Sequence, residues 1–264
     1  MSIPAYLILG SQTSGRCGVC ADVIFKALGD DDFCGVFISK NETPTEFDKK
    51  IASAPIAGFV NYKDAEDARE KIAALDESRF THVFYIADST KNLADEIEEF
   101  KKTVDCGKIR LARIWSVLDC ATVVRHPNEC MPYADALAHF ADCMLLSRRN
   151  GVPNKEVDNI KARYEKLCYP MLTELVNKKF EVSRPIDLLI EEARRITVMF
   201  DDIDPIDELE IDENNIPEEP FNLERKTDPY MQKAANGMRI KPIPNIAEYA
   251  LETREFEKKQ NEEI

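Results

Sequence analysis

The chain has 264 residues, of which 44% are hydrophobic and 32% are charged, and its formal net charge is -14. This acidity argues against nucleic-acid binding, because nucleic-acid-binding proteins concentrate basic residues on one face. No run of about 18 apolar residues is present, and residues 1–4 lack the basic and then apolar layout of a secretory signal. We therefore expect a soluble, cytoplasmic protein that does not enter a membrane.

The first 200 residues alternate between short apolar runs and amphipathic stretches. Short apolar runs between turn signals are typical of buried strands, and apolar residues at intervals of three and four are typical of helices. The predicted strands cover residues 5–9, 33–38, 56–60, 82–87, 111–118 and 143–146. The predicted helices cover residues 16–28, 64–75, 92–103, 132–141, 153–168 and 185–199. The alternation predicts a three-layer α/β domain with a doubly wound, mostly parallel sheet.

The composition changes at residue 201. Residues 201–264 contain 18 acidic and 8 basic residues and are interrupted by prolines. Such a segment cannot bury much of its own surface, yet apolar side chains recur through it. They are Ile203, Ile206, Leu209, Ile211, Ile216, Phe221, Leu223 and Tyr230. We expect a domain over residues 1–200 and an extended acidic arm over residues 201–264 that ends in a short helix near 245–260. The arm is either flexible or ordered along a protein partner.

A glycine-rich loop follows the first predicted strand and resembles a phosphate-binding P-loop. That motif reads G-x-x-x-x-G-K-[ST], because glycines let backbone N–H groups surround phosphates, the Lys contacts the outer phosphates and the hydroxyl ligates Mg²⁺. Residues 10–17 read GSQTSGRC, with Gly10, Ser14 and Gly15 in the glycine frame. Arg16 replaces the lysine and Cys17 replaces the hydroxyl residue. The spacing therefore indicates nucleotide-binding ancestry with altered chemistry.

The two replacements affect different parts of a nucleotide site. Arg16 can contact a phosphate bidentately, although its planar guanidinium does not reproduce a compact ammonium. The alternative is that Arg16 pairs with a local carboxylate or with a partner. A thiol is a poor Mg²⁺ ligand, since Mg²⁺ prefers oxygen. We therefore leave the cofactor open, with a nucleotide expected before Mg²⁺, and do not expect ordinary Mg²⁺-dependent hydrolysis.

The chain has eight cysteines and no export signal, so we expect most thiols to be small apolar core groups rather than disulfides. Cys17 and Cys20 form a C-x-x-C at the start of a predicted helix, where thiol pKa values fall. A redox or soft-metal role for this pair is the alternative to core packing. Asp88 and Asp119 each end an apolar run, and ligands bind near the carboxyl ends of strands in doubly wound folds. Asp88 is also suited to capping the following helix.

The order of these motifs resembles that of the CobW family of P-loop GTPases, which are associated with metal trafficking and metallocofactor maturation. Each further motif of that family has an altered counterpart here. Residues 58–62 stand in place of a G-C-x-C-C motif with no cysteine, and residues 88–95 resemble the E-[ST]-[ST]-G-L-A segment. Residues 115–120 resemble the strand ending in V-V-D-A, and residues 140–150 resemble A-D-x-x-x-x-N-K-x-D, with residues 147–150 (SRRN) in place of N-K-x-D. The resemblance covers roughly residues 1–180 and implies a nucleotide-binding G domain.

In the intact family motif, an Asp carboxylate reads guanine; here Asn150 stands in that position without a charge. The resemblance therefore implies a degenerate GTPase that has lost groups for phosphate, magnesium, base and transition metal. Our interpretation is a non-catalytic accessory or scaffold subunit of a hetero-oligomer that binds a protein partner through residues 201–264. The partner would be a metalloenzyme or its maturation machinery. The alternative is a nucleotide-binding switch or metallochaperone with a modified loop, using Gly10, Ser14, Gly15, Arg16, Cys17, Asp88 and Asn150.

Overall fold

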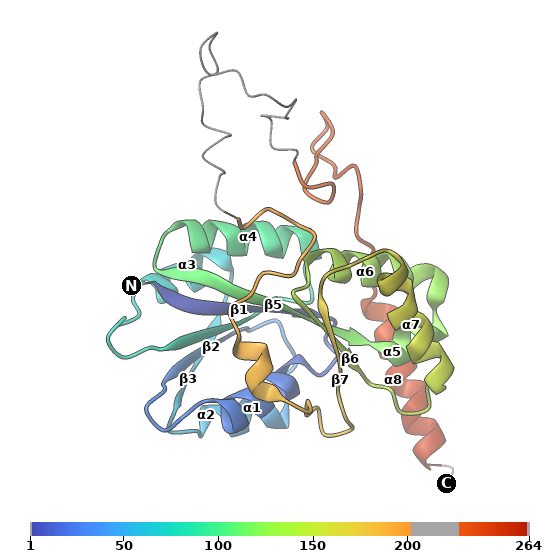
Figure 1. Ribbon diagram of the computed structural model, residues 1–264, viewed down its shortest axis with the longest axis horizontal. Helices are drawn as coiled ribbons and strands as arrows, with labels where there is room; N and C mark the ends of the chain where they lie inside the picture. Colours follow the sequence, from blue (N-terminus) through green and yellow to red (C-terminus); the bar gives the residue numbers. More distant parts are fainter. Residues whose placement is uncertain (1, 202–226, 263–264) are drawn as a thin grey trace. The chain divides into compact units, whose positions relative to one another are not determined.

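The computed structural model describes residues 2–201 and 227–262 (Figure 1). The chain divides into two compact units. One unit, called the body here, comprises Met1–Ile196 and Ile243–Ile264, and the other comprises Thr197–Pro242. The structure therefore groups the C-terminal residues with the body, whereas the sequence analysis assigned them to the arm. Residues 202–226, which carry most of the apolar positions noted in the arm, lie outside the described residues.

The body is built on a parallel sheet of seven strands in the order β3-β2-β4-β1-β5-β6-β7. The strands are β1 (Ile3–Gly10), β2 (Cys34–Ser39), β3 (Ala57–Tyr62), β4 (His82–Ile86), β5 (Ile109–Asp119), β6 (Cys143–Ser147) and β7 (Leu172–Leu175). The central strands are buried on both faces, which is why they read as nearly continuous apolar runs. The predicted fold class is confirmed.

Helices cover both faces of this sheet. They are α1 (Arg16–Ala27), α2 (Glu46–Ala52), α3 (Ala65–Ala73), α4 (Leu93–Asp105), α5 (Cys120–Arg125), α6 (Pro127–Phe140), α7 (Asn154–Lys166) and α8 (Ala247–Glu262). Figure 1 shows α1 and α2 on one face and α3, α4 and α6 on the other. The sequence analysis missed α2, α5 and β7. Of these, β7 is a four-residue edge strand with the sequence LTEL, whose polar residues hide the strand pattern.

The helix expected over residues 185–199 is wrong. Only Pro185–Leu189 forms a turn of 3-10 helix, η1, and residues 190–196 continue as an irregular strap. The carbonyl groups that a helix would use are taken by side chains of the sheet. Trp115 donates its indole N–H to the carbonyl of Leu188 at 3.1 Å. The hydroxyl of Tyr6 donates to the carbonyl of Leu189 at 3.0 Å.

The strap also ends on a buried carboxylate. Asp142, which is fully buried, accepts hydrogen bonds from the backbone N–H of Ile114 at 2.7 Å and of Arg194 at 2.6 Å. The guanidinium of Arg195 lies 3.3 Å from the same carboxylate. Burial raises the pKa of Asp142, and Arg195 opposes that effect. One side chain thus joins β5 to the strap, which fixes a segment that has no regular backbone ladder of its own.

The smaller unit contains a tight turn. Lys233 and Arg239 form an isolated antiparallel bridge, and Gly237 at the turn has a φ of 80°. The ammonium of Lys241 lies 4.0 Å from the centre of the Tyr230 ring.

The helix expected near residues 245–260 is present as α8, which belongs to the body.

Candidate functional site

The carboxyl ends of β1 and β4 form the edge where a ligand site is expected. These two strands are neighbours, and the chain leaves β1 toward α1 on one face but leaves β4 toward α4 on the other (Figure 1). Neighbouring strands whose connections diverge in this way leave a crevice between their loops. Residues 10–15 after β1 and residues 87–92 after β4 therefore define the candidate site.

The loop after β1 has the glycine geometry that its sequence predicts. Gly10 has a φ of 143°, and a Cβ at this position would lie 2.5 Å from the carbonyl oxygen of Val117. Gly15 has a φ of 89° and immediately precedes α1. The buried hydroxyl of Ser14 donates to the carbonyl of Ser11 at 2.8 Å, so it is used within the loop. The strand, glycine loop and helix are all present.

Arg16 is buried in an ion pair. Its guanidinium lies 2.8 Å from Oε1 of Glu42, and the two side chains are only 3% and 5% exposed. Arg16 also donates to the carbonyl of Ala87, at the end of β4. Glu42 accepts a second bond from the backbone N–H of Ser89 at 2.6 Å. Burial favours the neutral guanidinium, but Glu42 outweighs it and holds the pKa of Arg16 above its usual value. Its charge is therefore directed at a carboxylate of the same chain.

Asp88 is engaged by donors on both of its oxygens. Oδ2 accepts from the Ser39 hydroxyl and the Asn41 amide, each at 2.8 Å. Oδ1 accepts from the backbone N–H of Thr90 at 3.0 Å and from its hydroxyl at 2.6 Å. Burial alone would raise the pKa of Asp88, but these hydrogen bonds hold it below its usual value. The carboxylate is ionised and organises the turn into α4.

Asp119, at the end of β5, connects the glycine loop to Arg148, which follows β6. The buried carboxylate of Asp119 accepts a hydrogen bond from the Thr13 hydroxyl at 2.7 Å and lies 3.3 Å from Nε of Arg148. Arg148 also pairs with Glu257 of α8. Burial raises the pKa of both Asp119 and Glu257, and Arg148 opposes that effect at each carboxyl. This chain of contacts joins the glycine loop to the C-terminal helix.

The two thiols of the C-x-x-C do not have reactive surroundings. Cys17 is half-buried and Cys20 is fully buried. Burial, reinforced by the nearby Asp48 carboxylate, raises the pKa of Cys17 to about 12. Burial also raises the pKa of Cys20 well above its usual value. Among the described residues, no group of three or more His, Cys, Asp or Glu side chains is placed to hold a metal ion.

Phe180 covers the start of α1, and the sequence analysis did not identify it. A Cβ on Gly15 would lie 2.1 Å from the Phe180 ring, and one on Gly18 would lie 2.5 Å from its Cβ. The ring also packs edge-on against Phe47, with centroids 5.7 Å apart. Phe180 itself has a φ of 61°. The glycines of α1 therefore admit this aromatic ring, and no local motif around residue 180 signals that contact.

The predicted site residues are divided among three cavities. Gly10 and Asp88 line a cavity of about 310 Å³. Gly15, Arg16 and Cys17 line a second cavity of about 380 Å³. Asn150, which is exposed, lines a third cavity of about 500 Å³ together with Arg148, Arg149 and Phe180. The structure thus brings the loop and Asp88 together but places Asn150 at a separate opening.

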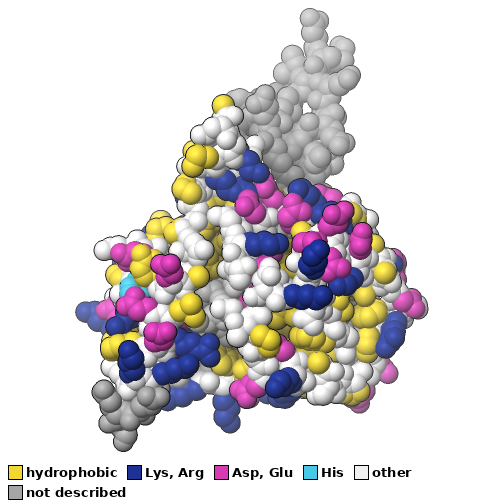
Figure 2. Space-filling model, turned by 180° about the vertical axis from the view of Figure 1, so that it is seen from behind, with side chains coloured by type: hydrophobic (Ala, Val, Ile, Leu, Met, Phe, Trp, Pro, Cys, Tyr) yellow, Lys and Arg dark blue, Asp and Glu magenta, His cyan; other side chains and the backbone are white. Residues whose placement is uncertain are grey.

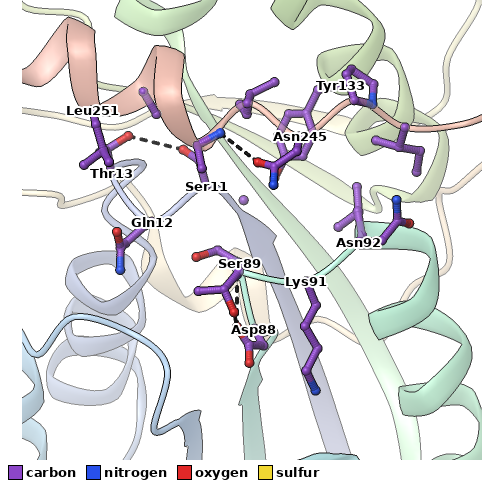
Figure 3. Close-up of a pocket in the computed structure, with 18 residues that line it drawn as sticks. Ser11, Gln12, Thr13, Asp88, Ser89, Lys91, Asn92, Tyr133, Asn245 and Leu251 are labelled. Carbon is purple, nitrogen blue, oxygen red and sulfur yellow. Dashed lines mark hydrogen bonds between the residues drawn. The ribbon is translucent and has the colours of Figure 1, made fainter.

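The C-terminal residues form a wall of the first cavity, which the sequence analysis did not anticipate. Residues 243–247, Ala250 and Leu251 face the loop residues 10–13 across it (Figure 3). The α8 helix is held by the Arg125 guanidinium, 3.6 Å from the centre of the Phe256 ring, and by contact of the His126 and Tyr249 rings. Figure 2 shows basic and acidic side chains interspersed on one face of the molecule, and α8 carries the exposed Arg254, Lys258 and Lys259.

The residues present do not fit a magnesium-bound nucleotide. The Arg16 guanidinium is paired with Glu42, the Cys17 thiol stays protonated, and both Asp88 oxygens accept two hydrogen bonds each. A nucleoside triphosphate needs cationic groups around its phosphates, and Mg²⁺ needs oxygen ligands. The glycine loop retains the backbone shape of a phosphate site without these groups.

No protein-family model matches the chain, and no curated protein matches it in sequence. Among solved structures, it is similar to the Zn(II)-bound YjiA GTPase from E. coli, at 14% identity and a TM-score of 0.47, over 72% of this chain and 62% of that chain. A Zn(II)-bound triple mutant of YjiA has the same identity and coverage and a TM-score of 0.48. The signal recognition particle receptor FtsY from Elizabethkingia anophelis, in complex with GDP, is 12% identical over 73% of this chain and 65% of that chain, with a TM-score of 0.48. The chain thus spans 62–65% of the length of these structures.

None of the described helices has the length and apolar character needed to cross a membrane.

The thiol environment leads to a labelling prediction. In the native protein at about pH 8, iodoacetamide should alkylate the exposed Cys106 and Cys168 before Cys17 and Cys20, because only thiolates react and burial keeps Cys17 protonated. Peptide mass spectrometry over a time course measures the order. Labelling of Cys17 ahead of Cys106 would contradict this account and would favour a redox role for the C-x-x-C.

Proposed function

We propose that this chain is a non-catalytic P-loop-type domain that acts as an accessory or scaffold subunit and binds a protein partner. The observation that carries the proposal is the buried Arg16–Glu42 pair. Arg16, which stands in the lysine position of the loop, is engaged by this pair. Breaking the pair would leave the Glu42 carboxylate buried without a compensating charge. The loop is therefore used as a structural connection between β1 and β4 rather than as a phosphate clamp.

Two further observations support a structural use of this edge. Phe180 packs on the start of α1, where free backbone N–H groups would otherwise face an anion. Arg148, which follows β6, bridges Asp119 and Glu257 instead of presenting its charge to a ligand. The charged groups Arg16 and Arg148 thus pair with carboxylates of the body itself.

The partner surface that we propose is the acidic segment after residue 201. Residues 201–264 have a large acidic excess, and the apolar residues between 203 and 223 are more frequent than solvation of a linker requires. Apolar side chains spaced along an extended segment supply affinity in peptide recognition, and carboxylates supply specificity. A metalloenzyme or its maturation machinery is the partner class that the CobW resemblance suggests.

A nucleotide-binding switch remains the competing function, and the retained glycine loop is the observation that favours it. In that case Arg16 would contact phosphate in a rearranged state. The two functions differ in what the Arg16 charge stabilises, and a double-mutant cycle measures how much its pairing with Glu42 contributes to stability.

Substitution Arg16→Met keeps an unbranched apolar stem at this position and removes the guanidinium with its charge. We expect it to lower the free energy of unfolding by about 3 kcal/mol, because Glu42 is left buried without its partner. Glu42→Gln should also destabilise, and the double variant should recover at least about 1 kcal/mol relative to the sum of the single changes. Urea denaturation measures all three. Additive losses, or an Arg16→Met variant with unchanged stability, would contradict the structural role of the pair.

The partner proposal is tested on the full-length chain isolated gently from its own cells. Native mass spectrometry should show a companion protein in fixed stoichiometry. Replacing Ile206 and Leu209 by Ser should remove the companion, whereas replacing Asn214 and Asn215 by Ser in the same segment should leave it bound. A chain that is monomeric in such extracts, or a companion lost equally from both variants, would argue against this proposal.

A further inference from the structure

We propose that the cavity between the glycine loop, the loop after β4 and the C-terminal segment binds a small uncharged molecule with an apolar body and a hydrogen-bonding end. The cavity has a volume of about 310 Å³, which is at the lower end of the range for small-molecule sites. It lies in the crevice between β1 and β4, where open parallel sheets bind their ligands. Nothing in the proposed scaffold role requires an occupant there, so the inference stands independently of it.

The walls come from three segments that are far apart in the sequence. Residues 10–13 and residues 88–93 form two sides, and residues 243–247 with Ala250 and Leu251 form the third (Figure 3). Tyr133 of α6 completes the lining. Leu93, Ile246 and Leu251 give this cavity a substantially apolar wall. A molecule bound here would contact all three segments and would hold the C-terminal segment against the loop.

The charge of the lining determines the class of ligand. Asp88 and Lys91 are the charged residues that line the cavity. Lys91 extends away from the cavity in Figure 3, and its ammonium lies 3.3 Å from the carboxylate of Glu96. Asp88 is ionised and already accepts hydrogen bonds from three residues. An anionic ligand would meet a carboxylate with no available cation, so the lining disfavours phosphates and carboxylates and favours a neutral molecule.

Several polar groups remain available for such a molecule. The Ser89 hydroxyl is buried, lines the cavity and has no hydrogen-bond partner among the described residues. A buried hydroxyl without a partner is costly, and a polar group of a ligand would supply the missing hydrogen bond. Asn92 and Asn245 use their Oδ1 atoms to accept from Ala94 and Ala247 at helix starts, at 3.0 and 2.9 Å. Their amide N–H groups are then the donors that these side chains can offer to a ligand.

Benzamide is a suitable probe, because it combines an aromatic body with a neutral amide, and benzoate is the matched anion of nearly the same shape. The full-length protein is titrated with each compound and followed by ¹H–¹⁵N NMR, including the side-chain amides of Asn92 and Asn245. We expect benzamide to shift these two amides and the backbone signals of Ser11 and Ser89, with a dissociation constant of about 1 mM for a fragment of this size. Benzoate should bind at least about tenfold more weakly.

Ser89→Ala separates a ligand site from a structural feature. Removing an unpartnered buried hydroxyl should leave the melting temperature unchanged or raise it, while benzamide binding should weaken several-fold. Ser183→Ala, at an exposed position outside the helices and strands, is the control and should change neither property. Equal shifts with benzoate, no shifts with benzamide at about 20 mM, or undiminished binding by the Ser89→Ala variant would overturn the proposal.

Discussion

The buried ion pair between Arg16 and Glu42 is the constraint on which the candidate site depends. A charged pair that is only a few per cent exposed persists only if its geometry is good and its remaining hydrogen bonds are satisfied. Both conditions are met, since Arg16 also reaches the carbonyl of Ala87 and Glu42 also accepts from the N–H of Ser89. The pair therefore connects the glycine loop after β1 to the turn after β4. A phosphate-binding loop presents a positive charge to its ligand, whereas here the charge of Arg16 stabilises a contact within the protein.

The same principle extends along the carboxyl edge of the sheet. Thr13, Asp119, Arg148 and Glu257 form a continuous polar path from the loop to α8. Each buried carboxylate on this path has a donor or a cation beside it, as burial of a charge requires. Because α8 belongs to this network, the C-terminal residues are part of the body, although some 50 residues of sequence that include the smaller unit separate them from the strap. Closure of this edge by its own chain also creates the cavity beside Ser89.

Much of the fold could be predicted because the central strands and the long helices carry local patterns. The apolar runs that became β1, β4 and β5 reflect burial on both faces, and the glycine frame at residues 10–15 reflects a backbone that only glycine adopts easily. The strap could not be predicted, because its carbonyls are taken by Trp115 and Tyr6, which are distant in sequence. Only its apolar spacing was visible, and that spacing suggested a helix.

The site was less predictable than the fold for the same reason. The sequence identifies Arg16 and Cys17 as departures from a phosphate-binding motif, but the pairing of Arg16 with Glu42 spans 26 positions and has no local signature. Phe180 packs beside Gly15 and Gly18, although it is distant from them in the sequence. Asn150, placed by motif order beside the loop, lines a separate cavity. The sequence shows which charged and polar side chains are present, whereas tertiary packing determines which side chains pair with them.

Calorimetric titration of the full-length protein with GTP and Mg²⁺ tests the central claim most directly. If the guanidinium of Arg16 remains paired with Glu42, no saturable binding should be seen up to about 1 mM nucleotide. Arg16→Met should then not change that result. Binding with a dissociation constant below about 10 μM that Arg16→Met abolishes would show that the guanidinium serves phosphate, and would contradict the account.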